Sequence, residues 1–177
     1  MKKLLLAAAF VACSLGANAQ VWVGGSFGLD FMKPDGADKT QTTFTIKPEV
    51  GYSLDEKWDL AVGVGFTSLS NVGGVKDAGN CTEFGINPYA RYTFANLGKV
   101  GFFADGGLDF GVVSPKHGDS HSSFWIGVRP GVKFAASDKI TFVAHLGQFG
   151  YKSVEDSYTD FGLSITNGLA FGLYYSF

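Results

Sequence analysis

Bulky apolar residues alternate with small or polar residues along almost the whole chain, and this pattern limits the available folds more than any other feature. The alternation recurs in eight segments, at about 23–31, 44–52, 58–67, 83–94, 101–110, 124–134, 140–147 and 161–177. Side chains of a strand point alternately to its two faces, so each segment predicts a β-strand with one bulky apolar face. No helical period of useful length occurs after the N-terminal segment. The sequence therefore predicts an all-β fold.

Residues 1–19 have the features of an export signal that is removed from the mature protein. A methionine and two lysines precede a short apolar run, and an A-x-A cleavage motif ends at Ala19. The run is too short to cross a bilayer as a helix, which takes roughly 20 apolar residues. Cys13 offers a lipoprotein as the alternative, but the residues before it make a poor lipid-attachment motif. We predict a signal peptide over 1–19 and a single domain over 20–177.

Charge and cysteine content exclude two further classes of protein. The formal net charge is -2, and no basic patch is present that would suit nucleic acid, so we expect no nucleic-acid partner. After removal of the signal, Cys81 is the only cysteine of an exported protein, so an intramolecular disulfide is not possible. Stability must then come from packing and backbone pairing.

The connections between the eight segments alternate in length. Tight turns are predicted at 55–57, 95–99 and 135–138, and longer polar loops at 32–43, 69–82, 113–122 and 152–160. Short and long connections in alternation predict an antiparallel up-and-down meander, with both termini at the end that carries the short turns. In an outer-membrane barrel that end faces the periplasm.

The sizes of the two strand faces indicate which face is outside. A soluble ligand-binding barrel of the lipocalin kind also has eight alternating strands. An interior of eight strands is, however, just wide enough to be filled by side chains or to hold one small ligand. One face here carries Phe, Trp, Ile, Leu and Val, whereas the other is rich in glycine with a few charges. We therefore expect the bulky face toward lipid and small residues with charges inside.

Aromatic residues of the bulky face form two groups, one near each end of the strands. Phe44 and Tyr52, like Trp58 and Phe66, are eight residues apart. Eight residues at about 3.3 Å each, tilted by about 40°, rise roughly 20 Å, close to the apolar band of about 25 Å between aromatic girdles. The loop-end group is Phe31, Phe44, Phe66, Phe84, Phe110, Phe124 and Phe161, and the turn-end group is Tyr52, Trp58, Tyr92, Phe94, Phe102, Phe134, Phe142, Tyr175 and Phe177.

Proline marks a repeat in alternate segments. Pro48, Pro88 and Pro130 lie about one hairpin apart within similar alternating runs, and 165–171 is a degenerate fourth copy without proline. Proline has no backbone donor and is normally confined to edge strands or bulges. Because the alternation keeps its phase on both sides of each proline, we expect no bulge there.

The chain ends in alternation, on Tyr175-Ser176-Phe177. This end resembles the C-terminal insertion signal of bacterial outer-membrane β-barrels. Together with the A-x-A signal and the proline-bearing strands, the chain resembles the small outer-membrane porin-family proteins common in Bacteroidota, with a topology like that of OmpA-type and OmpX-type barrels. The resemblance implies an eight-stranded antiparallel transmembrane β-barrel in the outer membrane of a Gram-negative cell. It also implies contact with outer-membrane lipid, lipopolysaccharide and the outer-membrane insertion machinery.

Charged residues of the small face are the candidate site. We expect Lys47, Glu49, Asp59, Glu83, Arg91, Asp105, Asp109, Arg129 and Lys133 to face the lumen, with His145 beside them. Buried charges need partners, so the favoured interpretation is an ion-pair and water network that plugs the lumen. The alternative is a narrow polar pore, with a pH-gating role for His145. Asp105 and Asp109 lie about 13 Å apart on one strand, too far to act together on one bond.

Catalytic and metal chemistry find little support. Some eight-stranded outer-membrane barrels are lipid A acyl-modifying enzymes, which use a serine, a histidine and an acid. His145 has no obvious serine at its level, so we expect no enzyme and no cofactor. His117 and His121 share one loop and lack a fixed third ligand, so we expect no metal site there.

The sequence thus predicts an integral outer-membrane barrel with a plugged polar lumen and a structural or surface-contact role. Recognition would fall to the loops at Asp35–Lys39, Lys76–Asn80, Lys116–His121 and Lys152–Asp160. The first alternative is a small porin or channel for ions or small solutes, which would conduct. The second is a soluble periplasmic binding barrel, which would stay in solution without detergent.

Overall fold

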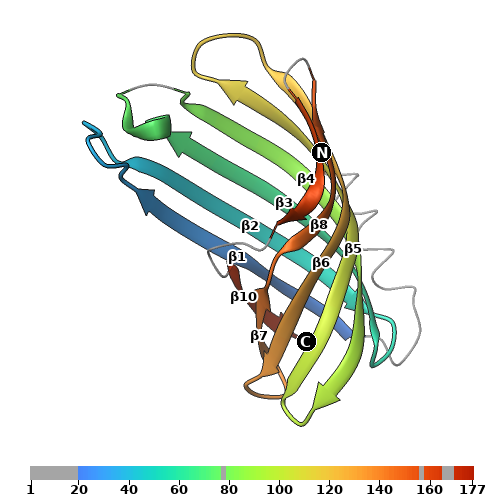
Figure 1. The fold of residues 1–177 in the computed structure, drawn as a ribbon. Helices are drawn as coiled ribbons and strands as arrows, with labels where there is room; N and C mark the ends of the chain where they lie inside the picture. Colours follow the sequence, from blue (N-terminus) through green and yellow to red (C-terminus); the bar gives the residue numbers. More distant parts are fainter. Residues whose placement is uncertain (1–19, 77–78, 156–157, 165–169) are drawn as a thin grey trace.

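The computed structural model describes residues 20–76, 79–155, 158–164 and 170–177, which form a closed antiparallel β-barrel (Figure 1). The predicted signal peptide lies outside the described residues. The strands are β1 (Gln20–Met32), β2 (Gln41–Ser53), β3 (Trp58–Ser70), β4 (Cys81–Leu97), β5 (Val100–Pro115), β6 (His121–Ala135), β7 (Ile140–His145), β8 (Gln148–Val154), β9 (Tyr158–Ser164) and β10 (Ala170–Ser176). A short 3-10 helix, η1 (Val72–Gly74), follows β3. Within the described ranges, no helix is long and apolar enough to cross a membrane.

The ten strands form eight staves of one barrel, as predicted, where a stave is one of the eight strand positions around the barrel wall. From β1 to β6, each strand pairs with the next one in sequence. β7 and β8 both pair with β6 and together make the seventh stave, while β9 and β10 belong to the eighth. β10 closes the ring against β1, from Trp22 opposite Ser176 to Phe27 opposite Phe171.

Two predicted features of the last hairpin are wrong. The seventh stave is not one regular strand. Gly131 of β6 lies opposite His145, and Val128 of β6 lies opposite Phe149. The β7–β8 segment therefore advances by four residues where β6 advances by three. This one-residue bulge moves the outward face from even to odd positions. The predicted fourth long loop, 152–160, is mostly strand, because polar cross-strand pairs such as Lys152 with Asp160 extend the ladder. Alternation of apolar residues cannot reveal such a polar extension.

The bulky face lies outside the barrel, as expected for contact with lipid. Phe27, Phe84 and Phe94 keep 59%, 60% and 58% of their surface exposed. The outward rings touch along each end of the barrel: Phe110 and Phe124 lie 5.4 Å apart between centroids at the loop end, and Trp58 and Tyr92 lie 4.7 Å apart at the turn end.

The prolines interrupt the ladder toward the following strand. Between Ile86, opposite Phe110, and Tyr89, opposite Gly107, the β4–β5 pairing skips Pro88 without changing register. Asn87 Nδ2 donates to the Leu108 carbonyl at 2.8 Å, and this bond replaces the donor that Pro88 lacks. The expectation of no bulge is confirmed within β6, whose pairing with β5 keeps its register through Pro130. The bulge described above lies in the neighbouring stave, beside Pro130.

The interior holds large rings as well as small residues and charges, which the sequence analysis did not expect. Each of four buried rings lies directly opposite a glycine: Trp22 opposite Gly51, Tyr89 opposite Gly107, Phe103 opposite Gly131, and Tyr174 opposite Gly24. A Cβ atom on Gly51 would lie 2.0 Å from the Trp22 ring, and one on Gly131 would lie 2.3 Å from Phe103. These glycines therefore leave the space in which the rings lie against the wall.

Two inward glycines of β1 test this packing. A Cβ atom on Gly24 would lie 2.3 Å from Tyr174 Cδ1 and 2.4 Å from the Leu173 carbonyl oxygen, whereas the nearest atom to one on Gly28 is 3.7 Å away. Gly24→Ala should lower the free energy of unfolding by about 1–3 kcal/mol through overpacking. Gly28→Ala should stay within about 0.5 kcal/mol of wild type. Urea unfolding in lipid vesicles measures both, and equal stability of the two variants would contradict the packing described.

Candidate functional site in the barrel interior

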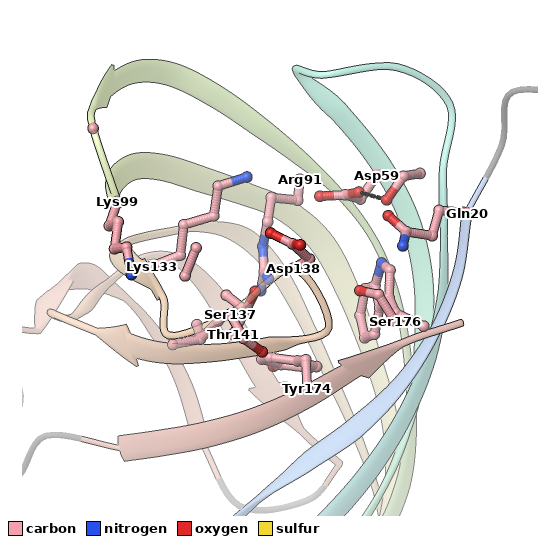
Figure 2. A pocket seen from close by; sticks show the side chains of 15 residues that line it. Gln20, Asp59, Arg91, Lys99, Lys133, Ser137, Asp138, Thr141, Tyr174 and Ser176 are labelled. Carbon is pink, nitrogen blue, oxygen red and sulfur yellow. Dashed lines mark hydrogen bonds between the residues drawn. The ribbon is translucent and has the colours of Figure 1, made fainter.

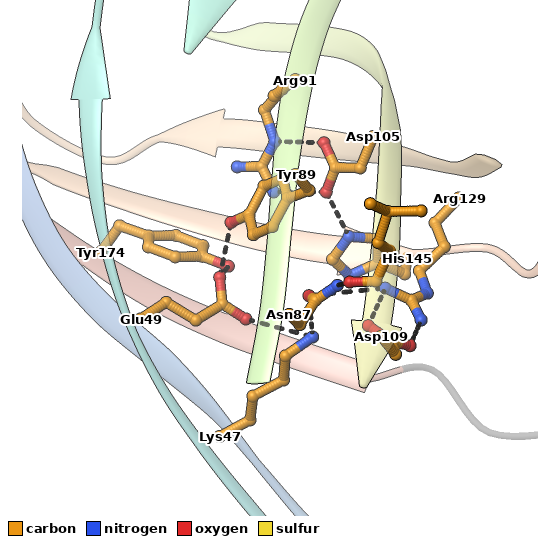
Figure 3. Close-up of polar contacts among 11 residues, drawn as sticks. Lys47, Glu49, Asn87, Tyr89, Arg91, Asp105, Asp109, Arg129, His145 and Tyr174 are labelled. Atoms are coloured by element: carbon orange, nitrogen blue, oxygen red, sulfur yellow. Dashed lines mark hydrogen bonds and ion pairs between the residues drawn. The ribbon is translucent and has the colours of Figure 1, made fainter. Parts of the chain in front are cut away.

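A bidentate ion pair lies at the centre of the lumen. Arg91 of β4 donates to its cross-strand neighbour Asp105 of β5 through Nε at 2.7 Å and through Nη2 at 2.8 Å (Figure 3). Both side chains are only 4% exposed. His145 of β7 lies 2.8 Å from the second Asp105 oxygen. A single carboxylate thus joins three staves of the barrel.

The short contacts of Glu49, on β2, come from hydroxyl groups. Tyr89 and Tyr174 donate to the same carboxylate oxygen at 2.6 and 2.9 Å (Figure 3). Tyr174 belongs to β10 and Tyr89 to β4, so Glu49 connects walls on both sides of it. Its distance to the ammonium of Lys47 is 3.8 Å.

Aromatic rings surround the guanidinium of Arg91. Its Cζ lies 4.1 Å from the centroid of Phe103, 5.4 Å from Tyr174 and 5.6 Å from Tyr89. Cation–π contacts of this kind strengthen when they are desolvated. We call the following residues the central layer, since all of them are at least 93% buried: Glu49, Tyr89, Arg91, Phe103, Asp105 and Tyr174.

A second group lies on the loop side of the central layer. Asn87 Oδ1 accepts hydrogen bonds from Lys47 Nζ at 2.5 Å and from Arg129 Nη1 at 3.5 Å. Arg129 also pairs with Asp109, and its guanidinium lies 3.8 Å from the centroid of Trp125. Lys47, Asn87 and Arg129 each precede one of the repeated prolines. The repeat thus brings equivalent positions of three hairpins together inside the barrel.

The remaining predicted charges hydrogen-bond to hydroxyl groups. Ser123 donates to Glu83 at 3.1 Å and Ser53 to Asp59 at 2.5 Å, while Lys133 donates to Thr93 at 2.8 Å. The predicted residues therefore do not form one continuous network of ion pairs. Among the described residues, every buried side-chain nitrogen and oxygen has a hydrogen-bond partner.

Two cavities lie on opposite sides of the central layer. The turn-side cavity, of about 370 Å³, is lined by Gln20, Asp59, Lys133 and also by Arg91 and Tyr174 of the layer (Figure 2). The loop-side cavity, of about 480 Å³, is lined by Glu49, Tyr89 and Asp105 of the layer and by Lys47, Arg129 and His145.

Sequence reasoning missed the neutral members of this site. Tyr89, Phe103 and Tyr174 stand at the alternate positions of their strands that point into the barrel. A bulky ring at such a position, where most residues are glycine, could have identified them. Asn87 and Thr93 gave no comparable signal, because their role depends on strands that are distant in the sequence.

The other candidate residues have simpler surroundings. Ser26 lines the loop-side cavity with His145, but within the described part of the chain no hydrogen bond joins them. Around His117 and His121, the described ranges hold no group of three or more possible metal ligands. Cys81 lies at the loop end of β4, beyond the aromatic girdle, where partial burial and then Glu83 raise the pKa of its thiol. A raised pKa lowers the thiolate fraction and with it the reactivity.

An amphipathic barrel with apolar residues outside and paired charges inside defines an outer-membrane β-barrel protein. The chain matches the family model of the outer membrane protein beta-barrel domain over residues 4–177 and belongs to that family. The Bacteroidota type stays a prediction.

Solved structures share this fold. The crystal structure of Neisserial surface protein A (NspA) has a TM-score of 0.58 and 18% identity over 91% of this chain and 98% of that one. Ail of Yersinia pestis, in a phospholipid bilayer nanodisc, has a TM-score of 0.55 and 14% identity, over 90% of this chain and 100% of that one. The N-terminal β-barrel domain of Pseudomonas aeruginosa OprF has a TM-score of 0.54 and 17% identity, over 92% of this chain and 99% of that one. No curated protein matches the chain. At these identities the likeness shows the fold alone.

Proposed function

We propose that the protein is a non-conducting integral outer-membrane barrel with a structural or surface-contact role. The observation that carries the proposal is the central layer. Arg91, Asp105 and His145 link β4, β5 and β7, while Glu49 and Tyr174 link β2 and β10. An ion passing through would have to displace these groups. Separating buried paired charges costs about 3–5 kcal/mol when one partner is left alone.

Contacts between neighbouring loops support recognition by the outer surface. Lys39 N donates to the Gly74 carbonyl at 2.9 Å, Lys116 N to Asn80 at 2.8 Å, and Glu155 N to Ser122 at 2.9 Å. These bonds join each loop region to the next along the rim. Loops fixed on a rigid scaffold are the usual place for binding. A surface partner would therefore meet loop regions that are fixed to one another at these three points.

The same proposal includes the route to the membrane. The signal peptide over 1–19 would direct export, and Tyr175 and Phe177 would serve as the insertion signal. Phe177 is 69% exposed, and its backbone N–H donates to the Val21 carbonyl at 3.1 Å. The apolar outer face would contact membrane lipid, with lipopolysaccharide at the loop end. We propose no enzymatic activity and no cofactor for this role.

The export route predicts the mature N-terminus. Protein isolated from the outer-membrane fraction of the producing cells should begin at Gln20, since cleavage follows the A-x-A motif. Intact-mass measurement checks this directly. A mass that includes residues 1–19, or a lipid-modified Cys13, would contradict it.

A channel for ions or small solutes is the second candidate. The two cavities favour it, because they meet the central layer from opposite ends of the lumen. Only the central layer would then have to rearrange for conduction.

Conductance of the refolded mature protein in a planar bilayer separates these functions. We expect no discrete steps for the wild type, with heat-modifiable gel migration as evidence of folding. The double variant Arg91→Ser/Asp105→Ser should conduct, because it widens the layer without leaving one buried charge alone. The matched control is Tyr92→Ser/Ala104→Ser, the adjacent cross-strand pair on the outer face, which should stay silent. Discrete steps in the wild type would contradict the proposal.

A further inference from the structure

The loop-side cavity has the size and lining of a site for a small polar ligand. Its volume of about 480 Å³ falls within the range of roughly 300–1,000 Å³ that is usual for ligand pockets. Five neutral side chains with hydrogen-bonding groups line it, beside a larger apolar surface: Ser26, Thr45, Thr67, Asn87 and Gln148. Such a wall suits a ligand that carries several hydroxyl groups.

The basic side chains of this cavity are more exposed than its acidic side chains. The side chains of Lys47, Arg129 and His145 keep 23%, 17% and 24% of their surface exposed. The carboxylates of Glu49 and Asp105, which also line the cavity, keep only 4% each. Those acids are covered because they are engaged by the tyrosines and by Arg91.

Two further acids lie nearby, Asp109 and Glu83, and Ser123 donates a hydrogen bond to Glu83. Asp109 is 34% exposed, but it pairs with Arg129 and lines an adjacent hollow of about 210 Å³. Its charge is therefore offset by its partner. The basic groups are therefore the more exposed charged groups of the loop-side cavity's own wall.

Lys47 is the basic group with the most binding capacity to spare. Its short contact is the neutral amide oxygen of Asn87 at 2.5 Å, and its ion pair with Glu49 is long, at 3.8 Å. An ammonium has three donors, so one donor remains for a ligand beside these two contacts. Arg129, by contrast, is engaged by Asp109 and stacked on Trp125.

We propose that the loop-side cavity binds a small hydroxylated carboxylate, such as a sugar acid, with the carboxylate on Lys47 and the hydroxyls on the neutral wall. Thr45 and Thr67, whose hydroxyl groups hydrogen-bond to each other at 3.2 Å, both line this space. The proposal needs the cavity only and holds whether or not the barrel conducts, so its test is independent of the conductance test.

Calorimetric titration of glucuronate into the refolded mature protein in detergent micelles tests it. We expect saturable binding of one ligand per chain, and binding of neutral glucose at least about tenfold weaker, because a charge-assisted hydrogen bond is lost. This comparison uses the wild type alone. Absence of binding to folded protein, or equal binding of glucose, would overturn the proposal.

Two lysine variants locate the site. Lys47→Gln keeps an amide donor for Asn87 but removes the charge, and should weaken glucuronate binding about tenfold or more. Lys133→Gln is the matched control, since Lys133 lines the turn-side cavity and bonds to Thr93. It should bind like the wild type. A loss in Lys133→Gln with none in Lys47→Gln would place the ligand on the wrong side of the central layer and refute the assignment.

Discussion

The narrow interior of an eight-stranded barrel is the constraint on which the rest of this structure depends. Side chains from facing walls meet there, so each inward position must suit the one opposite. Four of the buried rings fit because the partner strand supplies a glycine, as β1 does with Gly24 opposite Tyr174. Charges fit only where a partner is within reach, as Asp105 is for Arg91. The glycines and the charges of the inward face are therefore two results of the same limit.

The central layer contains both arrangements, rings packed against glycines and charges held by partners. Arg91 forms two hydrogen bonds to a carboxylate and lies among three rings, so its charge is balanced and its apolar surroundings are filled. Such a desolvated arrangement stays favourable only with all its partners present. The cavities on either side remain open to polar groups, and this gives one lumen two chemically different halves. We infer that recognition by this protein belongs to the loop-side half and the rim above it.

Much of the fold could be predicted from residue order, because period-two alternation and turn lengths are local properties. Eight staves, the outward bulky face and the tight turn before Trp58 all follow from them. The bulge beside Pro130 could not be predicted, since it lies in the neighbouring stave and not in the strand that carries the proline. The site was predictable by residue type but not by pairing. Nothing local indicates that Glu49 meets Tyr174, 125 positions away in sequence.

Water-edited solid-state NMR of the protein in lipid bilayers tests the central claim most directly, because it reports which side chains exchange magnetisation with water. If the central layer divides the lumen, the side-chain signals of Arg91 and Phe103 will build up slowly, while those of Lys47 and Lys133 will build up fast. Arg91 and Phe103 signals that build up as fast as those of the two lysines would mean that water passes through the layer, and would contradict the account.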